Sequence, residues 1–116
     1  MPSISIHVVD VSRGVVARGL RVEVFATAPA RRIIASGAIA ENGVLNDAAL
    51  AAIFPPGHYE AVFHIADYYK NESVPLPATP FLDIVTYRFG ITDSRQHYHL
   101  PFKMTPWGYS CFRGGA

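Results

Sequence analysis

The feature that most constrains the fold is the recurrence of short runs rich in β-branched and aromatic residues, each bounded by turn-forming residues. This spacing is typical of an all-β sandwich, because each short strand can bury one face against a second sheet. Residues that favour turns, such as Asn42-Gly43 and Pro55-Pro56-Gly57, separate the runs. We therefore predict an all-β sandwich with strands at residues 4–10, 20–27, 32–40, 58–66, 82–91, 97–104 and 107–113.

One stretch departs from the strand pattern. The sequence AALAAIF at 48–54 follows Asn46 and Asp47, either of which can cap a helix, and it ends at Pro55. We therefore expect the sandwich to carry one short helix. The chain has 116 residues, of which 50% are hydrophobic, so residues 1–116 are expected to form a single domain with a small core.

The charge balance and the N-terminal sequence limit the classes of partner. Ten Lys and Arg residues stand against nine Asp and Glu residues with no basic run, so we expect neither nucleic acid nor a membrane surface as a partner. No apolar run approaches the roughly 20 residues of a membrane span. The N-terminus lacks a secretory signal, and the single cysteine, Cys111, cannot form an intramolecular disulfide. A cytoplasmic protein is expected, with small molecules or other protein chains as partners.

Side-chain alternation along the predicted strands separates core residues from outward ones, because successive strand residues point to opposite faces. At 97–104 one face is apolar throughout and is assigned to the core, namely Tyr98, Leu100, Phe102 and Met104. The outward face of that strand carries His97, His99, Pro101 and Lys103. At 4–10 the outward residues are Ser5, His7 and Val9. His7 and His99 thus both point away from the core, whereas the pattern at 107–113 does not decide which face is inner.

Several chemistries could use two outward histidines. Most such histidines are ordinary surface residues, which is the simplest interpretation. A zinc site needs further acidic or thiolate ligands, which His7 and the His-x-His pair at 97–99 do not supply. Cys111 has no histidine at a diagnostic spacing, so a thiol nucleophile is not expected. General acid–base catalysis by His7 and His99 remains, because imidazole can take up and return a proton near neutral pH.

Four ordered segments resemble the transthyretin-related proteins, specifically the 5-hydroxyisourate hydrolases of purine degradation. The last segment is the most specific, since it is similar to the family's His-Tyr-His-x-Pro motif followed by its C-terminal Tyr-Arg-Gly-Ser signature. Together the segments extend over almost the whole chain. They read ISIHVVDVSRG, PPGHYEAVFHIADYY, PFLDIVTYRFGITD and HYHLPFKMTPWGYSCFRGG.

The resemblance implies a transthyretin-like sandwich of seven or eight strands, assembled as a homotetramer from two dimers with active sites in the channel between them. It implies a hydrolase that opens the six-membered lactam ring of 5-hydroxyisourate in urate degradation, with no metal or organic cofactor. The family's two catalytic histidines correspond to His7 and His99. The comparison also places residues along the channel wall, namely Val9, Pro101, Lys103, Ser110 and Phe112.

The chain departs from the family at several of these positions. Val44 stands where the family normally has an arginine, and Phe112 and Gly115 replace the tyrosine and serine of the terminal signature around Arg113. Lys103 occupies a position that is usually apolar. It either replaces the missing arginine's charge or extends into solvent. We expect the substrate-binding residues to be Val44, Lys103, Ser110, Phe112 and Arg113.

These departures leave two other functions open. One is a related hydrolase for an N-methylated 5-hydroxyisourate, since an alkylated ring has fewer ionisable nitrogens and suits Val44 and Phe112. The other is a binding protein that has the fold without the chemistry, as in transthyretin. The paired histidines of this chain favour hydrolysis over binding alone, because transthyretin's channel lacks them.

Overall fold

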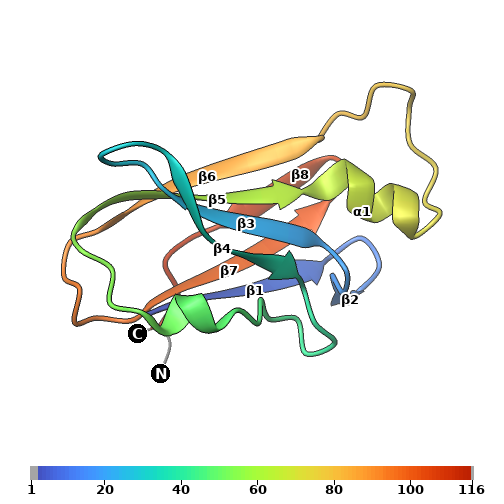
Figure 1. The fold of residues 1–116 in the computed structure, drawn as a ribbon. Coiled ribbons are helices and arrows are strands. Elements are labelled where there is room, and N and C mark those ends of the chain that lie inside the picture. Colours follow the sequence, from blue (N-terminus) through green and yellow to red (C-terminus); the bar gives the residue numbers. More distant parts are fainter. Residues whose placement is uncertain (1–2, 116) are drawn as a thin grey trace.

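The computed structural model describes residues 3–115, which form two four-stranded sheets packed face to face (Figure 1). The first sheet has the order β2-β1-β7-β8 and consists of β1 (Ile4–Asp10), β2 (Val15–Val16), β7 (Tyr98–Thr105) and β8 (Gly108–Cys111). The second has the order β4-β3-β5-β6 and consists of β3 (Arg21–Ala26), β4 (Arg32–Ala38), β5 (Gly57–His64) and β6 (Ile84–Ile91). The predicted two-sheet sandwich of seven or eight strands is confirmed. The strand that the sequence did not indicate is β2.

The core lies between the sheets and follows the predicted alternation. In β1 and β7 every second side chain is buried, and the intervening ones are partly or fully exposed. Phe63 of β5 and Phe102 of β7 stack across the interface, with ring centroids 3.8 Å apart. Stacked aromatic pairs add to the free energy that burial of their apolar area contributes. Packing between the two sheets therefore leaves the other side of β1 and β7 outside the core, where its side chains can contact a ligand or another chain.

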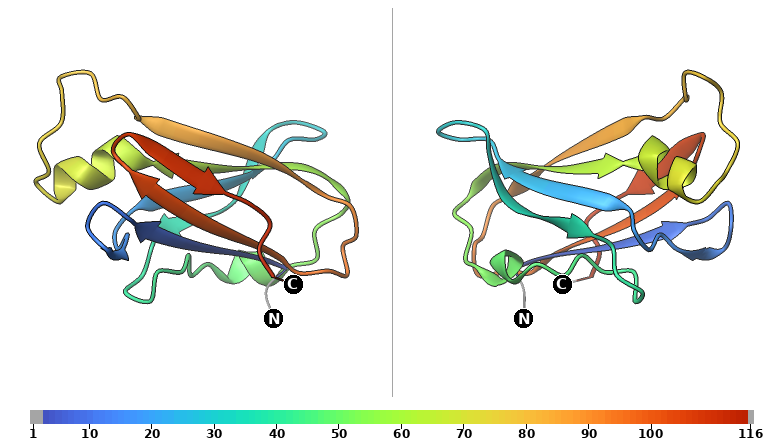
Figure 2. Two further views of the ribbon diagram at one scale, coloured as in Figure 1. Left: turned by 180° about the vertical axis from the view of Figure 1, so that it is seen from behind. Right: turned by 45° about the vertical axis from the view of Figure 1, so that its right-hand side comes forward.

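The pairing of β1 with β7 is the part of the topology that positions the histidines. These strands are parallel neighbours, whereas the other strand pairs of the first sheet are antiparallel. Ser5 lies opposite His99, and His7 lies opposite Pro101. Figure 2 shows the segment after β8 returning alongside β7 toward the end of the sandwich where β1 begins. Residues from both ends of the sequence thereby meet on one face.

The helical segments differ from the prediction in type and place. The segment predicted as a helix at 48–54 is a single 3-10 turn, η1 (Ala48–Ala51), and Asp47 caps it by accepting a hydrogen bond from the Ala49 amide. The α-helix of the fold is α1 (Ile65–Asn71), in a region that we predicted as the end of a strand followed by a loop. Within residues 3–115 no helix has the length and apolarity to cross a membrane.

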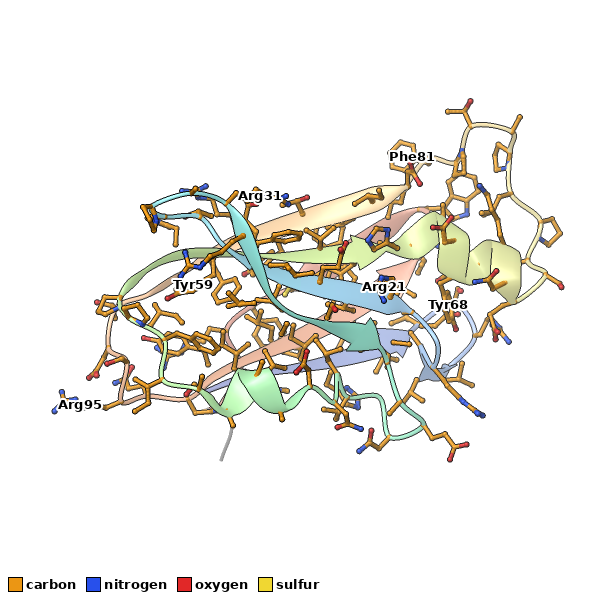
Figure 3. The ribbon with its side chains drawn as sticks, viewed as in Figure 1. Arg21, Arg31, Tyr59, Tyr68, Phe81 and Arg95 are labelled. Carbon is orange, nitrogen blue, oxygen red and sulfur yellow. The ribbon has the colours of Figure 1, made fainter. Side chains whose placement is uncertain are left out.

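A buried carboxylate attaches α1 to the first sheet. Asp10, at the end of β1, is 0% exposed and accepts hydrogen bonds from the hydroxyls of Ser12, Tyr68 and Tyr69. Burial, followed by the nearby Asp10 charge, raises the pKa of Tyr68 to about 12. Figure 3 shows Tyr68 on the α1 side of the molecule, where the helix meets the end of the first sheet. The two tyrosines therefore tie the helix to β1.

Candidate active site

The outward face of β1 and β7 carries the predicted histidines in a regular array. The outward pairs, in order along the strands, are Ser5 with His99, His7 with Pro101, and Val9 with Lys103. Successive outward pairs are spaced by about 6.6 Å, two residues of strand rise. His7 and His99 are therefore near neighbours on one face, as the alternation predicted. Lys103 lies one outward pair beyond His7 and two beyond His99.

Two further segments extend this face on either side. On the β1 edge, Val44 forms an antiparallel bridge with His7, and the Val8 amide donates to the Gly43 carbonyl at 2.9 Å. On the β7 side, the Gly114 amide donates to the His99 carbonyl at 2.7 Å. The turn at 42–44 and the C-terminal segment thus border the two histidines directly.

Glycines make room for both imidazole rings. A Cβ added at Gly43, whose φ is +84°, would lie 2.5 Å from His7 Nε2. A Cβ added at Gly114 would lie 2.8 Å from His99 Cδ2. Both contacts are shorter than side chains tolerate, so each ring packs directly over glycine backbone. These two glycines hold the rings in place and were not identified from the sequence as part of the site.

A hydroxyl joins two histidines on this face. Ser5 Oγ lies 2.6 Å from His99 Nδ1 and 2.8 Å from His97 Nε2. The rings of His97 and His99 are nearly parallel, with centroids 6.4 Å apart. Alternation had placed Ser5 and His97 on the outward face without giving them a role. Their role depends on β1 lying parallel beside β7, and no local pattern in the sequence encodes that pairing.

The environment of His99 favours its neutral form. Burial is the largest cause that lowers the pKa of His99, and the positive charges that His97 and His7 can carry lower it further. A hydrogen bond with the backbone of Ser5 acts in the opposite direction and is the smallest contribution. Because the hydrogen bond to Ser5 uses Nδ1, Nε2 is the nitrogen left to meet a ligand. His99 is therefore suited to accept a proton near neutral pH.

The orientation of β8, which the sequence left open, is settled by its contacts. Tyr109 stacks on Phe102 at 5.3 Å, and Cys111 packs against the core, so both face inward. Ser110 lies opposite Lys103 and shares its outward face. Phe112 follows Cys111 by one residue and is 51% exposed.

Lys103 and Ser110 lie two outward pairs from His99 and one outward pair beyond His7. They line a shallow pocket of about 340 Å³ together with Val11, Met104, Thr105, Gly108 and Tyr109. Lys103 is two outward pairs from His99, which corresponds to about 13 Å between their Cα atoms along β7. The lysine is exposed, as its outward position requires.

Arg113 is turned away from the outward face. Its guanidinium stacks on the ring of Tyr98 at 4.1 Å and donates to Gln96 Oε1 at 3.0 Å. It also donates to the His97 carbonyl at 3.3 Å. Arg113 thereby fastens the C-terminal segment to the start of β7 and does not point toward the His7 and His99 rings. Among the five expected substrate-binding residues, Val44 lies nearest the histidines.

A pocket next to Ser5 offers space for a small ligand. Its volume is about 390 Å³, and it lies between the start of β1 and η1. Its lining consists of Ile4, Ser5, Val44, Leu45, Asn46, Asp47, Ala48, Leu50 and Ala51. The lining thus includes Ser5 and Val44, the neighbours of His99 and His7, but neither histidine itself.

The structure gives less support for a metal site or for a thiol nucleophile. Within residues 3–115, no group of three or more His, Cys, Asp or Glu side chains is placed to hold a metal ion. Burial raises the pKa of the Cys111 thiol to about 11, so it is protonated at neutral pH and a poor nucleophile. The arrangement is best suited to proton transfer by imidazole.

Comparison with known proteins gives matches over nearly the whole chain. Residues 4–114 match the model of the HIUase/Transthyretin family. A 5-hydroxyisourate hydrolase of Deinococcus radiodurans is 40% identical over 115 residues, covering 97% of this chain and 96% of that protein. The 5-hydroxyisourate hydrolase 2 of Rhizobium meliloti is 38% identical over 110 residues, covering 93% and 92%.

Solved structures agree on the fold. An (S)-allantoin synthase structure superposes with a TM-score of 0.88 at 28% identity, covering 97% of this chain and 43% of that one, so this chain spans less than half its length. The structure of Klebsiella pneumoniae 5-hydroxyisourate hydrolase has a TM-score of 0.79 at 24% identity, with 99% and 100% coverage. The second likeness concerns the fold alone.

Proposed function

The chain belongs to the HIUase/transthyretin family, and from this membership and the histidine array we propose that it hydrolyses the six-membered lactam ring of 5-hydroxyisourate or a close analogue. Membership confirms the resemblance drawn from the four sequence segments. The observation that carries the proposal is His99, which is held at Nδ1 by Ser5 and stands beside His7 on one outward face.

In the proposed reaction, His99 Nε2 takes a proton from water as the water oxygen attacks the ring carbonyl carbon. His7 assists by bonding to the reacting groups from the neighbouring strand. The carbon–nitrogen bond of the ring then breaks, and a protonated histidine returns the proton to the departing nitrogen. The products are an N–H group, which receives one proton of the water through imidazole, and a carboxylic acid, which keeps the other proton and ionises to a carboxylate by releasing it to solvent. No metal or organic cofactor takes part in these steps.

Val44 supports a second candidate substrate, an N-methylated 5-hydroxyisourate. Val44 pairs directly with His7, where the family usually has an arginine. An apolar side chain beside the histidine provides no charge for an anionic ring, but it can pack against a methyl group. Phe112 stands where the family has a tyrosine. Its exposed ring likewise offers apolar surface for a methyl group and lacks the hydroxyl. We therefore infer that the site is tuned to a neutral, alkylated ring.

We further propose that the chain assembles as a homotetramer, a dimer of dimers, with this face lining a shared channel. Val11 and Phe112 are large apolar side chains exposed next to this face, and Trp107 is exposed at the turn between β7 and β8. Monomeric proteins rarely expose so many large apolar groups close together. Sedimentation that finds only monomer at micromolar concentration would contradict the channel.

The test of the proposed function uses hydroxyisourates made in solution. An oxidase would generate 5-hydroxyisourate and its N-methylated analogue from the corresponding urates, and their decay would be followed by ultraviolet absorbance. Faster decay with the purified protein, and a higher kcat/KM for the methylated compound, are the expected results. A protein that is stabilised by these ligands in thermal melts but accelerates neither decay would instead be a binding protein.

A further inference from the structure

The Ser5 hydroxyl carries one proton, which restricts how it can bond to two imidazoles. It can donate to at most one ring, and it accepts from any ring nitrogen that carries a proton. A general base at His99 Nε2 must be unprotonated there, so the proton of the neutral ring resides on Nδ1. His99 Nδ1–H then donates to Ser5 Oγ, and the Ser5 hydroxyl donates to His97 Nε2.

His97 borders a second pocket, at the end of the sandwich. This pocket has a volume of about 270 Å³ and is lined by Ser3, Ala51, Ile53, Ser94, Arg95, Gln96 and His97. Figure 3 shows Arg95 projecting from this end of the molecule, away from the sheets. A positive charge on His97 can be solvated from this pocket, whereas burial opposes a positive charge on His99.

We propose that Ser5 and His97 are positioning residues that fix the tautomer of His99 and take up its proton during turnover. This inference rests on the proposed hydrolysis. It assigns to the site a hydroxyl and a third imidazole that act through His99.

The step balances as a reversible relay. When His99 Nε2 takes a proton from the attacking water, the Nδ1 proton passes to Ser5 Oγ as the Ser5 proton passes to His97 Nε2. His97 is then the cation, and His99 is neutral with a proton on Nε2. As the ring carbon–nitrogen bond breaks, both protons return along the same path and His99 Nε2–H is donated to the departing nitrogen. The three groups end in the state in which they began.

The charged groups around the relay are already engaged elsewhere or belong to the site. Arg113 is bonded to Gln96 and to the His97 carbonyl. Arg95 pairs with Asp93 at 3.0 Å. The Asp47 carboxylate, on the segment beside β1, accepts from the Ser36 and Ala49 amides. Among residues 3–115, His7 is thus the remaining titratable group that acts on His99 in addition to His97.

The first test is a matched pair of variants at Ser5. Ser5→Thr keeps the hydroxyl, and Ser5→Val has the same shape with a methyl group in its place; both β-branched residues suit a strand. We expect Ser5→Thr to retain most of the wild-type kcat. Ser5→Val should lower kcat by about 10- to 100-fold, the range seen when the partner that orients a metal-bound histidine is removed. KM should change by less than about twofold, because the relay acts after binding.

A second readout does not depend on activity. Side-chain ¹⁵N chemical shifts of His99 report its tautomer, and we expect mainly Nδ1–H in wild type and Ser5→Thr but a larger fraction of Nε2–H in Ser5→Val, where only the hydrogen bond with the backbone of residue 5 remains. Equal kcat values for the two variants, or equal His99 tautomers, would each overturn the relay. If wild type hydrolyses no hydroxyisourate, the proposed function fails, and the tautomer shifts alone decide whether Ser5 positions His99.

The other end of the relay is tested with His97→Gln, which can still bond to Ser5 but cannot become a cation. We expect kcat to fall about 10-fold. The acidic limb of the pH–kcat profile should move to higher pH, because removing the His97 charge raises the pKa of His99. His58→Gln, an exposed histidine on the second sheet, is the control. A His97→Gln enzyme that matches this control in kcat and pH profile would overturn the proposal.

Discussion

Strand β1 carries two polar clusters, one near each end, and they differ in a way that separates function from structure. At its end, Asp10 is 0% exposed and accepts hydrogen bonds from Tyr68 and Tyr69. Near its start, Ser5 contacts His97 and His99 on a face that is only partly covered. Figure 3 shows Tyr68 and Arg95 marking these opposite ends of the molecule.

The difference between the two clusters shows how to distinguish a polar group that stabilises the fold from one that is available for catalysis. The Asp10 carboxylate has its hydrogen bonds satisfied within the fold, and a closed network of this kind stabilises packing. His99 uses only one ring nitrogen for the fold and keeps the other for a ligand. We therefore expect substitutions at the first cluster to change stability and those at the second to change turnover.

The largest expected effect is on turnover at His99. His99→Gln should lower kcat by about 10²- to 10⁴-fold, the range for losing a general acid–base group. The midpoint of thermal unfolding should stay close to that of wild type, because the ring is partly exposed and lies over glycine backbone. Rates and melting curves of His99→Gln and the His58→Gln control check this. Full activity in the variant would show that His99 is an ordinary surface histidine.

The next effect is on stability at Asp10. Asp10→Ala removes the acceptor of two buried tyrosine hydroxyls and should lower the free energy of unfolding by about 3 kcal/mol. Urea denaturation measures this loss, with the exposed Ser12→Ala variant as a milder control. The folded fraction should keep normal kcat. A large loss of kcat in fully folded Asp10→Ala would show that the two clusters are coupled and would break the comparison.

The two clusters also differ in what the sequence predicted. Alternation placed His7 and His99 outward because it depends only on strand geometry. It could not reveal that Ser5 meets His99, since that contact requires β1 and β7 to pair in parallel. The helix α1 was missed, and the hydrogen bonds of its buried tyrosines go to Asp10, which lies far away in the sequence. Contacts between distant segments are thus the part that local patterns do not supply.

A smaller effect concerns substrate choice at Val44. Val44→Arg should raise kcat/KM for unmethylated 5-hydroxyisourate and lower it for the N-methylated compound, each by about 10-fold, because it places a charge next to His7. Val44→Leu adds bulk without charge and is the matched control. The ultraviolet assay with both substrates measures the change. Wild type preferring the unmethylated compound, with Val44→Arg changing nothing, would contradict a site tuned to an alkylated ring.

The pH dependence of kcat tests whether the pKa of His99 is lowered. Since burial and the charges of His97 and His7 lower the pKa of His99, the acidic limb of kcat should have its midpoint below the usual histidine value of 6.5. As pH falls through this midpoint the base becomes protonated and turnover is lost. His7→Gln removes one repelling charge, so the limb should move to higher pH. A wild-type midpoint above 6.5 would contradict the lowered pKa.

The smallest expected effect is at Lys103, which lies on the same face but two outward pairs from His99. A distance of about 13 Å along β7 exceeds the screening length of an exposed charge at physiological salt, about 8 Å. Lys103→Leu should therefore change kcat/KM by less than about twofold, with Lys103→Glu as a test of charge at the same position. If the ammonium instead replaces the missing arginine, Lys103→Leu would cost about 10²- to 10³-fold, as loss of an oxyanion donor does. In that case Lys103 and its neighbour Ser110 would belong to the catalytic cluster. The active face would then extend over all three outward pairs of β1 and β7.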